Sequence, residues 1–341
     1  MAMLRTVLGD IDAAASGPIL PHEHLYCDLR PLADREPIRD DPAGVEAAEL
    51  PLLLEAHQAG ATLLVEPTPP GIGRDPLLLR RLSEHSFVGV IAATGLYKEP
   101  LLPRRAYTRS EEELAQWFVH EISAGILPIT GDSLLGVSLL SDQVLGKASD
   151  ALIETPVQAG VIKLAASDGG LQEVEAKALR AAWMAAQATG AAMVSHCPRG
   201  AAFQQQLDVL AAAGGDPARL VQVHAHAEPD FALHLAALRR GAWLEYDAIG
   251  GRPDDLFIDL IRRVLDAGFA HRLLLSQDVV GWRAGSPAGA NLDPESGRPK
   301  RRYAYLLTEF LPRLQAAGVS AATIRQLTDD NPRQLLSLAA V

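Results

Sequence analysis

The 341-residue sequence has few cysteines, few aromatic side chains and no excess of positive charge. Its two cysteines, Cys27 and Cys197, lie far apart and indicate no disulfide framework, so a reducing cytoplasm is the expected location. Acidic residues outnumber basic residues by 42 to 31. This balance argues against nucleic acid or an anionic membrane as a partner, because both select clustered Lys and Arg.

Long apolar runs and targeting patterns are also missing. No run reaches the ~18 apolar residues that a membrane span needs, and residues 1–12 lack the basic-then-apolar pattern of a secretory signal. No Gly-x-Gly-x-x-Gly follows an early strand pattern, so a dinucleotide-binding fold has no support. What is present is 48% apolar residues, enough for a sizeable core.

Short apolar runs alternate with helical patterns along most of the chain. Because each run is nearly continuous, the pattern predicts parallel strands covered by helices. The eight predicted strands span residues 17–24, 61–66, 88–94, 157–165, 192–196, 220–224, 243–249 and 272–277. The predicted helices span residues 44–59, 75–85, 110–124, 173–189, 201–213, 230–240, 254–267 and 302–317. Eight such repeats favour a closed (β/α)8 TIM barrel, and we expect residues 1–341 to form one domain.

Three segments depart from this alternation. Residues 126–153 are mostly small and apolar, and we expect an extra loop or short helices there. Residues 279–300 are rich in Gly, Pro, Asn and Ser and are too long for an ordinary connection, which indicates an active-site loop. Near the C-terminus, Asn331-Pro332 is predicted to form a turn.

Six side chains suited to metal chemistry fall at or near the C-terminal ends of the predicted strands. They are His22, His24, Lys163, His196, His224 and Asp278. The spacing of the two histidines in His-x-His places both rings on one face of a strand. Each residue alone has an ordinary structural explanation. However, these explanations would have to hold independently on five different strands. Because barrel active sites lie at these strand ends, the pattern predicts one metal-binding pocket.

The chemistry of this set agrees with a metal centre. Four imidazoles and one carboxylate suit a borderline divalent cation such as zinc. A lysine ammonium has only donors and cannot ligate a metal. Lys163 therefore either pairs with an acid or is chemically altered. Two metals held ~3.5–4 Å apart would need an anionic bridge.

Together with three short motifs, this set resembles the phosphotriesterase family of the amidohydrolase superfamily. The motifs are Gly160-Val161-Ile162-Lys163, Thr94-Gly95-Leu96-Tyr97 and Asn331-Pro332-Arg333. The resemblance covers nearly the whole chain. It implies that Lys163 is carboxylated and bridges two divalent metals, with zinc expected and manganese, cobalt or iron as alternatives. It assigns His22, His24 and Asp278 to one metal and His196 and His224 to the other.

The resemblance also implies an activity. A metal-bridging hydroxide would attack the substrate, with Asp278 as general base. The leading hypothesis is a lactonase that opens a small sugar or acyl lactone, and Tyr97 resembles the tyrosine of the lactonase branch. A phosphotriesterase or carboxylesterase is the alternative, and a binding protein without catalysis is less favoured. Family members are commonly dimers, so we expect a homodimer that acts on small molecules.

Substrate selection is predicted to involve loop residues. Tyr97 would orient the lactone ring and donate to the leaving alkoxide, although a half-buried loop tyrosine is the alternative interpretation. Lys98 resembles members that act on sugar lactones, some of them phosphorylated, and Arg252 would fill a basic position after the seventh strand. After the eighth strand only Arg283 is basic, which argues against a phosphorylated substrate. Trp282 indicates a partly apolar leaving-group pocket.

Three nearby residues are expected to play supporting roles. His226, two residues after His224, is predicted to lie beside the metals rather than to be a further ligand. Cys197 follows His196 and would point away from the site on a continuing strand. Cys27 is predicted to be a packing residue.

Overall fold

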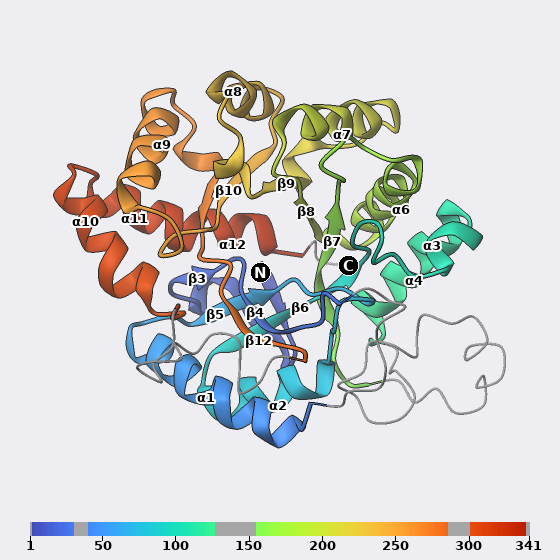
Figure 1. Ribbon diagram of the computed structural model, residues 1–341, viewed down its shortest axis with the longest axis horizontal. Coiled ribbons are helices and arrows are strands. Elements are labelled where there is room, and N and C mark those ends of the chain that lie inside the picture. Colours follow the sequence, from blue (N-terminus) through green and yellow to red (C-terminus); the bar gives the residue numbers. More distant parts are fainter. Residues whose placement is uncertain (1, 31–39, 127–154, 286–300, 339–341) are drawn as a thin grey trace.

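An eight-stranded parallel sheet forms the centre of the protein (Figure 1). The computed structural model describes residues 2–30, 40–126, 155–285 and 301–338. In spatial order the strands run β11-β10-β9-β8-β7-β6-β5-β3. Their bounds are β3 Ile19–Leu20, β5 Leu63–Glu66, β6 Gly89–Gly95, β7 Ala159–Ala165, β8 Ala192–His196, β9 Leu220–Val223, β10 Trp243–Tyr246 and β11 Leu273–Leu275.

Hydrogen bonds beyond the paired residues join the two edge strands, β3 and β11. The His22 amide donates to Ser276 Oγ at 2.9 Å, and the Asp278 amide donates to the His22 carbonyl at 3.1 Å. Glu23 is fully buried between the same segments. Its carboxylate accepts hydrogen bonds from Ser276 Oγ at 2.9 Å and from the Val279 amide at 2.8 Å. The sheet is thereby nearly closed, which confirms the predicted (β/α)8 barrel.

Helices surround the strands on the outside (Figure 1). The helices that follow the barrel strands are α1 Pro42–Gln58, α2 Pro76–Ser86, α3 Arg105–Thr108, α4 Glu111–Ser123, α6 Glu173–Thr189, α7 Gly200–Ala212, α8 Phe231–Arg239 and α9 Asp254–Asp266. A capping box opens α4, since Ser110 and Glu113 bond each other's backbone amides. Within the described ranges, we find no helix with the length and apolar character needed to cross a bilayer.

Alternation along the strands divides the core into two clusters. Residues 161, 194 and 243 belong to an inner core inside the barrel. Residues 162, 193 and 244, their sequence neighbours, belong to an outer core between strands and helices. Successive side chains of a strand point to opposite faces, so every second residue of a barrel strand faces the interior. This rule decides which polar side chains reach the site.

One feature at the N-terminal side of the barrel was not predicted. A hairpin of β1 (Met3–Thr6) and β2 (Gly9–Asp12) precedes the barrel, and its Leu4 belongs to the inner core. The Val7 amide donates to the Val90 carbonyl at 2.8 Å, near the start of β6. The hairpin therefore packs at the end of the barrel opposite the predicted site.

The predicted first strand, residues 17–24, is wrong in its second half. The chain leaves the sheet after β3, because Pro21 has no amide to continue the ladder, and β4 (His24–Cys27) starts four residues later. β4 pairs in parallel with β12 (Val280–Arg283), so the segment predicted as a loop over 279–300 begins with a strand. His22 and His24 therefore do not share one continuous strand.

Contacts on both sides anchor the chain around residues 286–300. On one side, the Ala284 amide donates to the Cys27 carbonyl at 2.9 Å. On the other side, Arg301 Nη1 donates to the Asp278 carbonyl at 3.0 Å, and its Nη2 donates to the Gln277 carbonyl. The expected extra segment at 126–153 lies almost wholly outside the described residues.

The C-terminal region is helical, in line with the helix predicted over residues 302–317, but it differs from expectation at Asn331-Pro332. A π-helical turn, Leu306–Phe310, precedes α10, and a second one, Gln326–Asp330, joins α11 to α12. The bounds of these helices are α10 Leu311–Ala316, α11 Ala321–Arg325 and α12 Asn331–Leu336. The predicted turn at Asn331-Pro332 is wrong because these residues open α12, where proline fits the first turn of a helix.

We expect Gly95→Ala to destabilise the fold far more than Gly60→Ala. Both glycines have positive φ, 107° and 103°, so either alanine is strained by about 1–3 kcal/mol. A Cβ at Gly95 would also lie 2.0 Å from the Lys163 carbonyl oxygen, whereas a Cβ at Gly60 meets no atom within 4 Å. Urea unfolding of both variants measures the difference. Equal free energies of unfolding would contradict the close packing of β6 against β7.

Candidate metal centre

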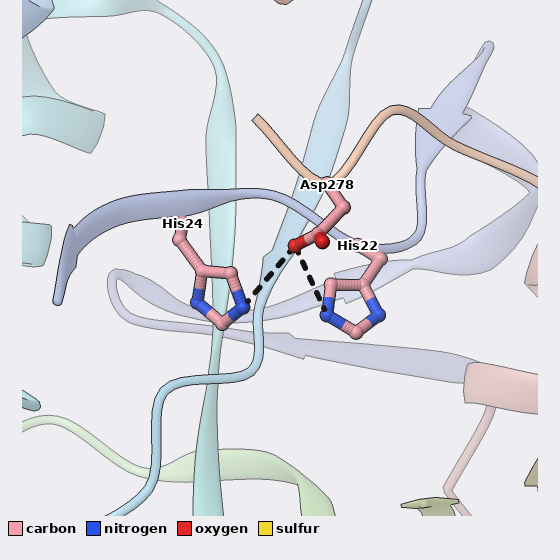
Figure 2. A group of neighbouring side chains, drawn as sticks. All are labelled: His22, His24 and Asp278. Atoms are coloured by element: carbon pink, nitrogen blue, oxygen red, sulfur yellow. Dashed lines mark ion pairs between the residues drawn. The ribbon is translucent and has the colours of Figure 1, made fainter. Parts of the chain in front are cut away.

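Two histidines and one carboxylate converge at the seam of the barrel, where the edge strands β3 and β11 meet. The ligand atoms of His22, His24 and Asp278 all lie within 4.8 Å of one another. Asp278 Oδ1 is 3.8 Å from His22 Nε2 and 3.6 Å from His24 Nε2. Figure 2 shows the carboxylate between the two rings. Asp278 has a φ of 50°, so a left-handed turn just after β11 aims its side chain at the histidines.

Lys163 joins this group from the opposite side of the barrel. Its neighbours Ile162 and Leu164 belong to the outer core, so Lys163 faces the interior. The side chain is buried, and its Nζ lies 3.4 Å from His22 Nε2. Burial lowers the pKa of the Lys163 amine, although the Glu245 charge opposes the shift.

His196 and His224 form a second pair beside the first group. His224 Nε2 lies 2.8 Å from His196 Nδ1, and the ring centroids are 4.5 Å apart. His196 shares the inward face of β8 with Val194. His224 follows the inward Val223 and would point outward on a straight strand, but its φ of 62° turns it toward the site. No alternation pattern in the sequence could have shown this turn.

Tyr97 lies next to the second pair. Its hydroxyl is 3.4 Å from His196 Nδ1, and the two rings meet edge to face with centroids 5.2 Å apart. Burial raises the pKa of Tyr97 well above its ordinary value. The phenol therefore stays protonated near neutral pH and can act as a donor.

Two buried acids on β10 and just after it were missed by sequence reasoning. Trp243 belongs to the inner core, so Glu245 and Asp247 share its inward direction. Glu245 Oε1 lies 2.6 Å from His22 Nδ1, and Asp247 Oδ1 lies 2.8 Å from His224 Nδ1. The signal was present, since two acids at spacing i, i+2 interrupt an otherwise apolar predicted strand.

Two further ring nitrogens at the site lie close to oxygen atoms. His24 Nδ1 lies 2.7 Å from Thr68 Oγ1, and that hydroxyl contacts the buried Glu66 carboxylate. His226 Nδ1 lies 3.2 Å from Asp247 Oδ1. His226 therefore contacts the acid that supports His224.

The charges of the site are strongly coupled. Burial lowers the pKa of His22 well below its ordinary value, and the Lys163 charge lowers it further. Burial disfavours ionised Asp247, but the facing His224 outweighs burial and holds the pKa of Asp247 well below its usual range. Burial likewise disfavours charged His224, but Asp247 prevails and raises its pKa. A neutral imidazole such as His22 is the form that binds metals.

A cavity of about 150 Å³ opens onto these side chains. Its lining residues are His24, Cys27, Leu29, Ile72, Tyr97, Lys163, His196, His224, Asp278, Val280 and Arg283. The lining thus combines polar groups at the barrel strand ends with the apolar side chains of Leu29, Ile72 and Val280, and part of it comes from β4 and β12.

The loop residues predicted to contact substrate are placed differently from one another. Tyr97 and Arg283 line the cavity, whereas Lys98, Arg252 and Trp282 are not among the described residues that do. Lys98 Nζ lies 3.3 Å from Asp168 Oδ1 in an ion pair. Arg252 is exposed, and Trp282 packs against the outer core.

Sequence comparison gives matches over nearly the full chain. A sequence profile described as "Phosphotriesterase family" matches residues 2–133 and 127–336. The phosphotriesterase homology protein of Escherichia coli K12 is 28% identical over 323 residues, which is 94% of this chain and 97% of the relative.

Two solved structures have the same fold. A point mutant of the organophosphorus hydrolase from Deinococcus radiodurans matches with a TM-score of 0.81 and 28% identity, over 98% of this chain and 97% of the other. A second structure is described as "Molecular Engineering of Organophosphate Hydrolysis Activity from a Weak Promiscuous Lactonase Template". It matches with a TM-score of 0.81 and 28% identity, over 98% of this chain and 100% of the other.

Zinc should raise the thermal stability of metal-stripped protein. A cation that binds only the folded state stabilises it by about 2.7 kcal/mol at a free concentration of about 100 Kd. Differential scanning calorimetry with and without zinc measures the shift. His24→Ala should reduce it, whereas His57→Ala, an exposed histidine on α1, should leave it unchanged. A zinc shift of full size in His24→Ala would contradict the site.

Proposed function

The chain belongs to the phosphotriesterase family, and from this premise we propose that it is a binuclear metal-dependent lactonase. The observation that carries the proposal is the convergence of Asp278 Oδ1 on the Nε2 atoms of His22 and His24. Asp278 and His24 also line the cavity that Lys163, His196 and His224 reach. The side chains proposed to hold two metals therefore surround one cavity in this chain.

The residues present fit a pair of metals. The Nδ1 atoms of His22 and His24 already face Glu245 and Thr68, so their Nε2 atoms remain available as ligands. His22, His24 and Asp278 would hold one metal, and His196 and His224 the other. When bound, two zinc ions (or manganese, cobalt or iron) would lower the pKa of a shared water and polarise the substrate carbonyl or phosphoryl oxygen.

Lys163 would bridge the two metals as a carbamate. An ammonium group has no lone pair for a metal, yet Lys163 lies inside the site with its Nζ 3.4 Å from His22 Nε2. Its neutral amine would form an N–C bond to carbon dioxide and lose one proton, which yields an anionic carboxylated lysine. The oxygen atoms of that anion would fill coordination positions that the histidines leave open.

The chain's own residues would then move protons and orient the substrate. The side chain of Asp278 is 30% exposed, more than those of His22 and His24, so it can take a proton from the attacking water and release it to solvent. Tyr97 would donate its hydroxyl hydrogen toward the alkoxide of the opened ring, since it lies beside His196 in the cavity.

The apolar cavity wall supports a lactone with an apolar substituent. Leu29, Ile72 and Val280 line it, and Tyr97, which the family resemblance likens to the tyrosine of the lactonase branch, lines the same cavity. One matched structure derives from a lactonase template. A phosphotriesterase is the second candidate because another is an organophosphorus hydrolase, and a carboxylesterase would use the same centre. From the family resemblance we also propose a homodimer.

Asp278→Asn should lower kcat/KM for lactones by about 10²–10⁴-fold, because the amide cannot accept the proton of the water. The zinc-loaded protein would be screened in a pH-stat against lactones, aryl esters and organophosphates. Asp168→Asn, an exposed carboxylate paired with Lys98, is the matched control and should keep full activity. A zinc-loaded wild-type protein that hydrolyses none of these substrates would refute the hydrolase assignment.

Arg283→Ala should raise KM for lactones that carry a carboxylate, and should leave KM for neutral acyl lactones unchanged. The reason is that Arg283 lines the cavity with a positive charge and is not one of the proposed metal-site residues. Lys98→Ala serves as the comparison, since Lys98 pairs with Asp168 away from the wall. If Lys98→Ala, and not Arg283→Ala, raises KM for anionic lactones, the proposal that Arg283 contacts the substrate carboxylate is wrong.

A further inference from the structure

We propose that Glu245 is a positioning residue that fixes the tautomer and orientation of His22, and thereby sets the metal affinity of the His22, His24 and Asp278 group. The inference rests on the proposed function, because it concerns the same metal centre. None of the three short motifs that carry the family resemblance contains Glu245.

The position of Glu245 follows from the strand. β10 alternates between the inner core at Trp243 and the outer core at Leu244, so the side chain at 245 must face the barrel interior. Glu245 is 0% exposed there. A carboxyl group in such a place needs a partner, because burial without one is costly.

The partner that the structure provides is a histidine ring. Glu245 Oε1 lies 2.6 Å from His22 Nδ1, which is a short hydrogen-bond distance. Glu245 Oε2 is buried with no hydrogen-bond partner among the described residues. A half-satisfied carboxylate is a poor choice for stability alone, which points to a role in the site.

The contact determines which nitrogen of His22 is free. A carboxylate oxygen accepts the Nδ1–H, so the lone pair of the neutral ring lies on Nε2. His22 Nε2 is the atom that faces Asp278 Oδ1 at 3.8 Å and Lys163 Nζ at 3.4 Å. Without Glu245 the ring could carry its hydrogen on Nε2, which would turn a donor toward the cation.

Asp247 cannot substitute for Glu245. Its nearest approach to His22 Nδ1 is 3.7 Å. Its two oxygens are engaged by His224, with the ring Nδ1 at 2.8 Å and the backbone amide at 3.0 Å. The two acids, two residues apart, therefore each serve a histidine of a different metal group.

The test compares Glu245→Met, Glu245→Gln and wild type for zinc affinity by chelator competition, independently of activity. We expect Glu245→Met to weaken one of two zinc sites by about 10–100-fold. Glu245→Gln should weaken it less, because the amide oxygen can still accept the Nδ1–H. Glu49→Gln is the matched control, since Glu49 is equally buried but bonds Tyr303 Oη at 2.7 Å. It should bind zinc as wild type does.

Wild-type affinity at both zinc sites in folded Glu245→Met would overturn the inference. If Glu245→Met does not fold, the ¹⁵N spectrum of the neutral His22 ring in metal-free wild type decides. A hydrogen on Nδ1 supports the inference, and a hydrogen on Nε2 overturns it. Wild-type protein that binds zinc but hydrolyses no lactone, ester or organophosphate would contradict the proposed function alone, since the affinity comparison still applies.

Discussion

The hydrogen bonds around Glu23 and Ser276 are the constraint on which the rest of the structure depends. They join β3 to the end of β11 where the ladder pairs stop, and they do so inside the protein, where burial raises the pKa of Glu23 to about 8. The same bonds fix His22 and Asp278, because the Asp278 amide donates to the His22 carbonyl. Closing the barrel and assembling the first metal group are therefore one structural event, and a cation there would bind across the seam.

Much of this arrangement could be predicted from the sequence, and the exceptions have physical reasons. Alternation alone puts Lys163 inside the barrel, and strand ends alone bring His196 to its mouth. The positive φ of His224 is a backbone conformation that no pattern of apolar and polar side chains predicts. The pairing of β4 with β12 joins residues far apart in sequence, so local propensity could not reveal it. Glu245 was not predicted as a site residue because the predicted strand over residues 243–249 was treated as a continuous apolar run.

The site divides its tasks between two parts of the fold. The barrel strand ends supply most of the proposed metal ligands, and the buried acids Glu245, Asp247 and Glu66 lie behind them. The small sheet of β4 and β12, which stands outside the barrel ladder, supplies His24 together with Cys27, Val280 and Arg283 of the cavity lining. Under the proposed function, hydrolytic chemistry would rest mainly on the barrel, and substrate choice mainly on the small sheet. Arg283 belongs to the second part, which is why its effect is expected on substrate binding.

The anchors on either side of residues 286–300 have a consequence for sequence variation within that range. Ala284 is bonded to Cys27, and Arg301 is bonded to the carbonyls of Gln277 and Asp278. Both anchors are made by residues outside 286–300, so a substitution, insertion or deletion within that range removes neither of them. The backbone of Asp278 can therefore be kept in place across variants of this stretch.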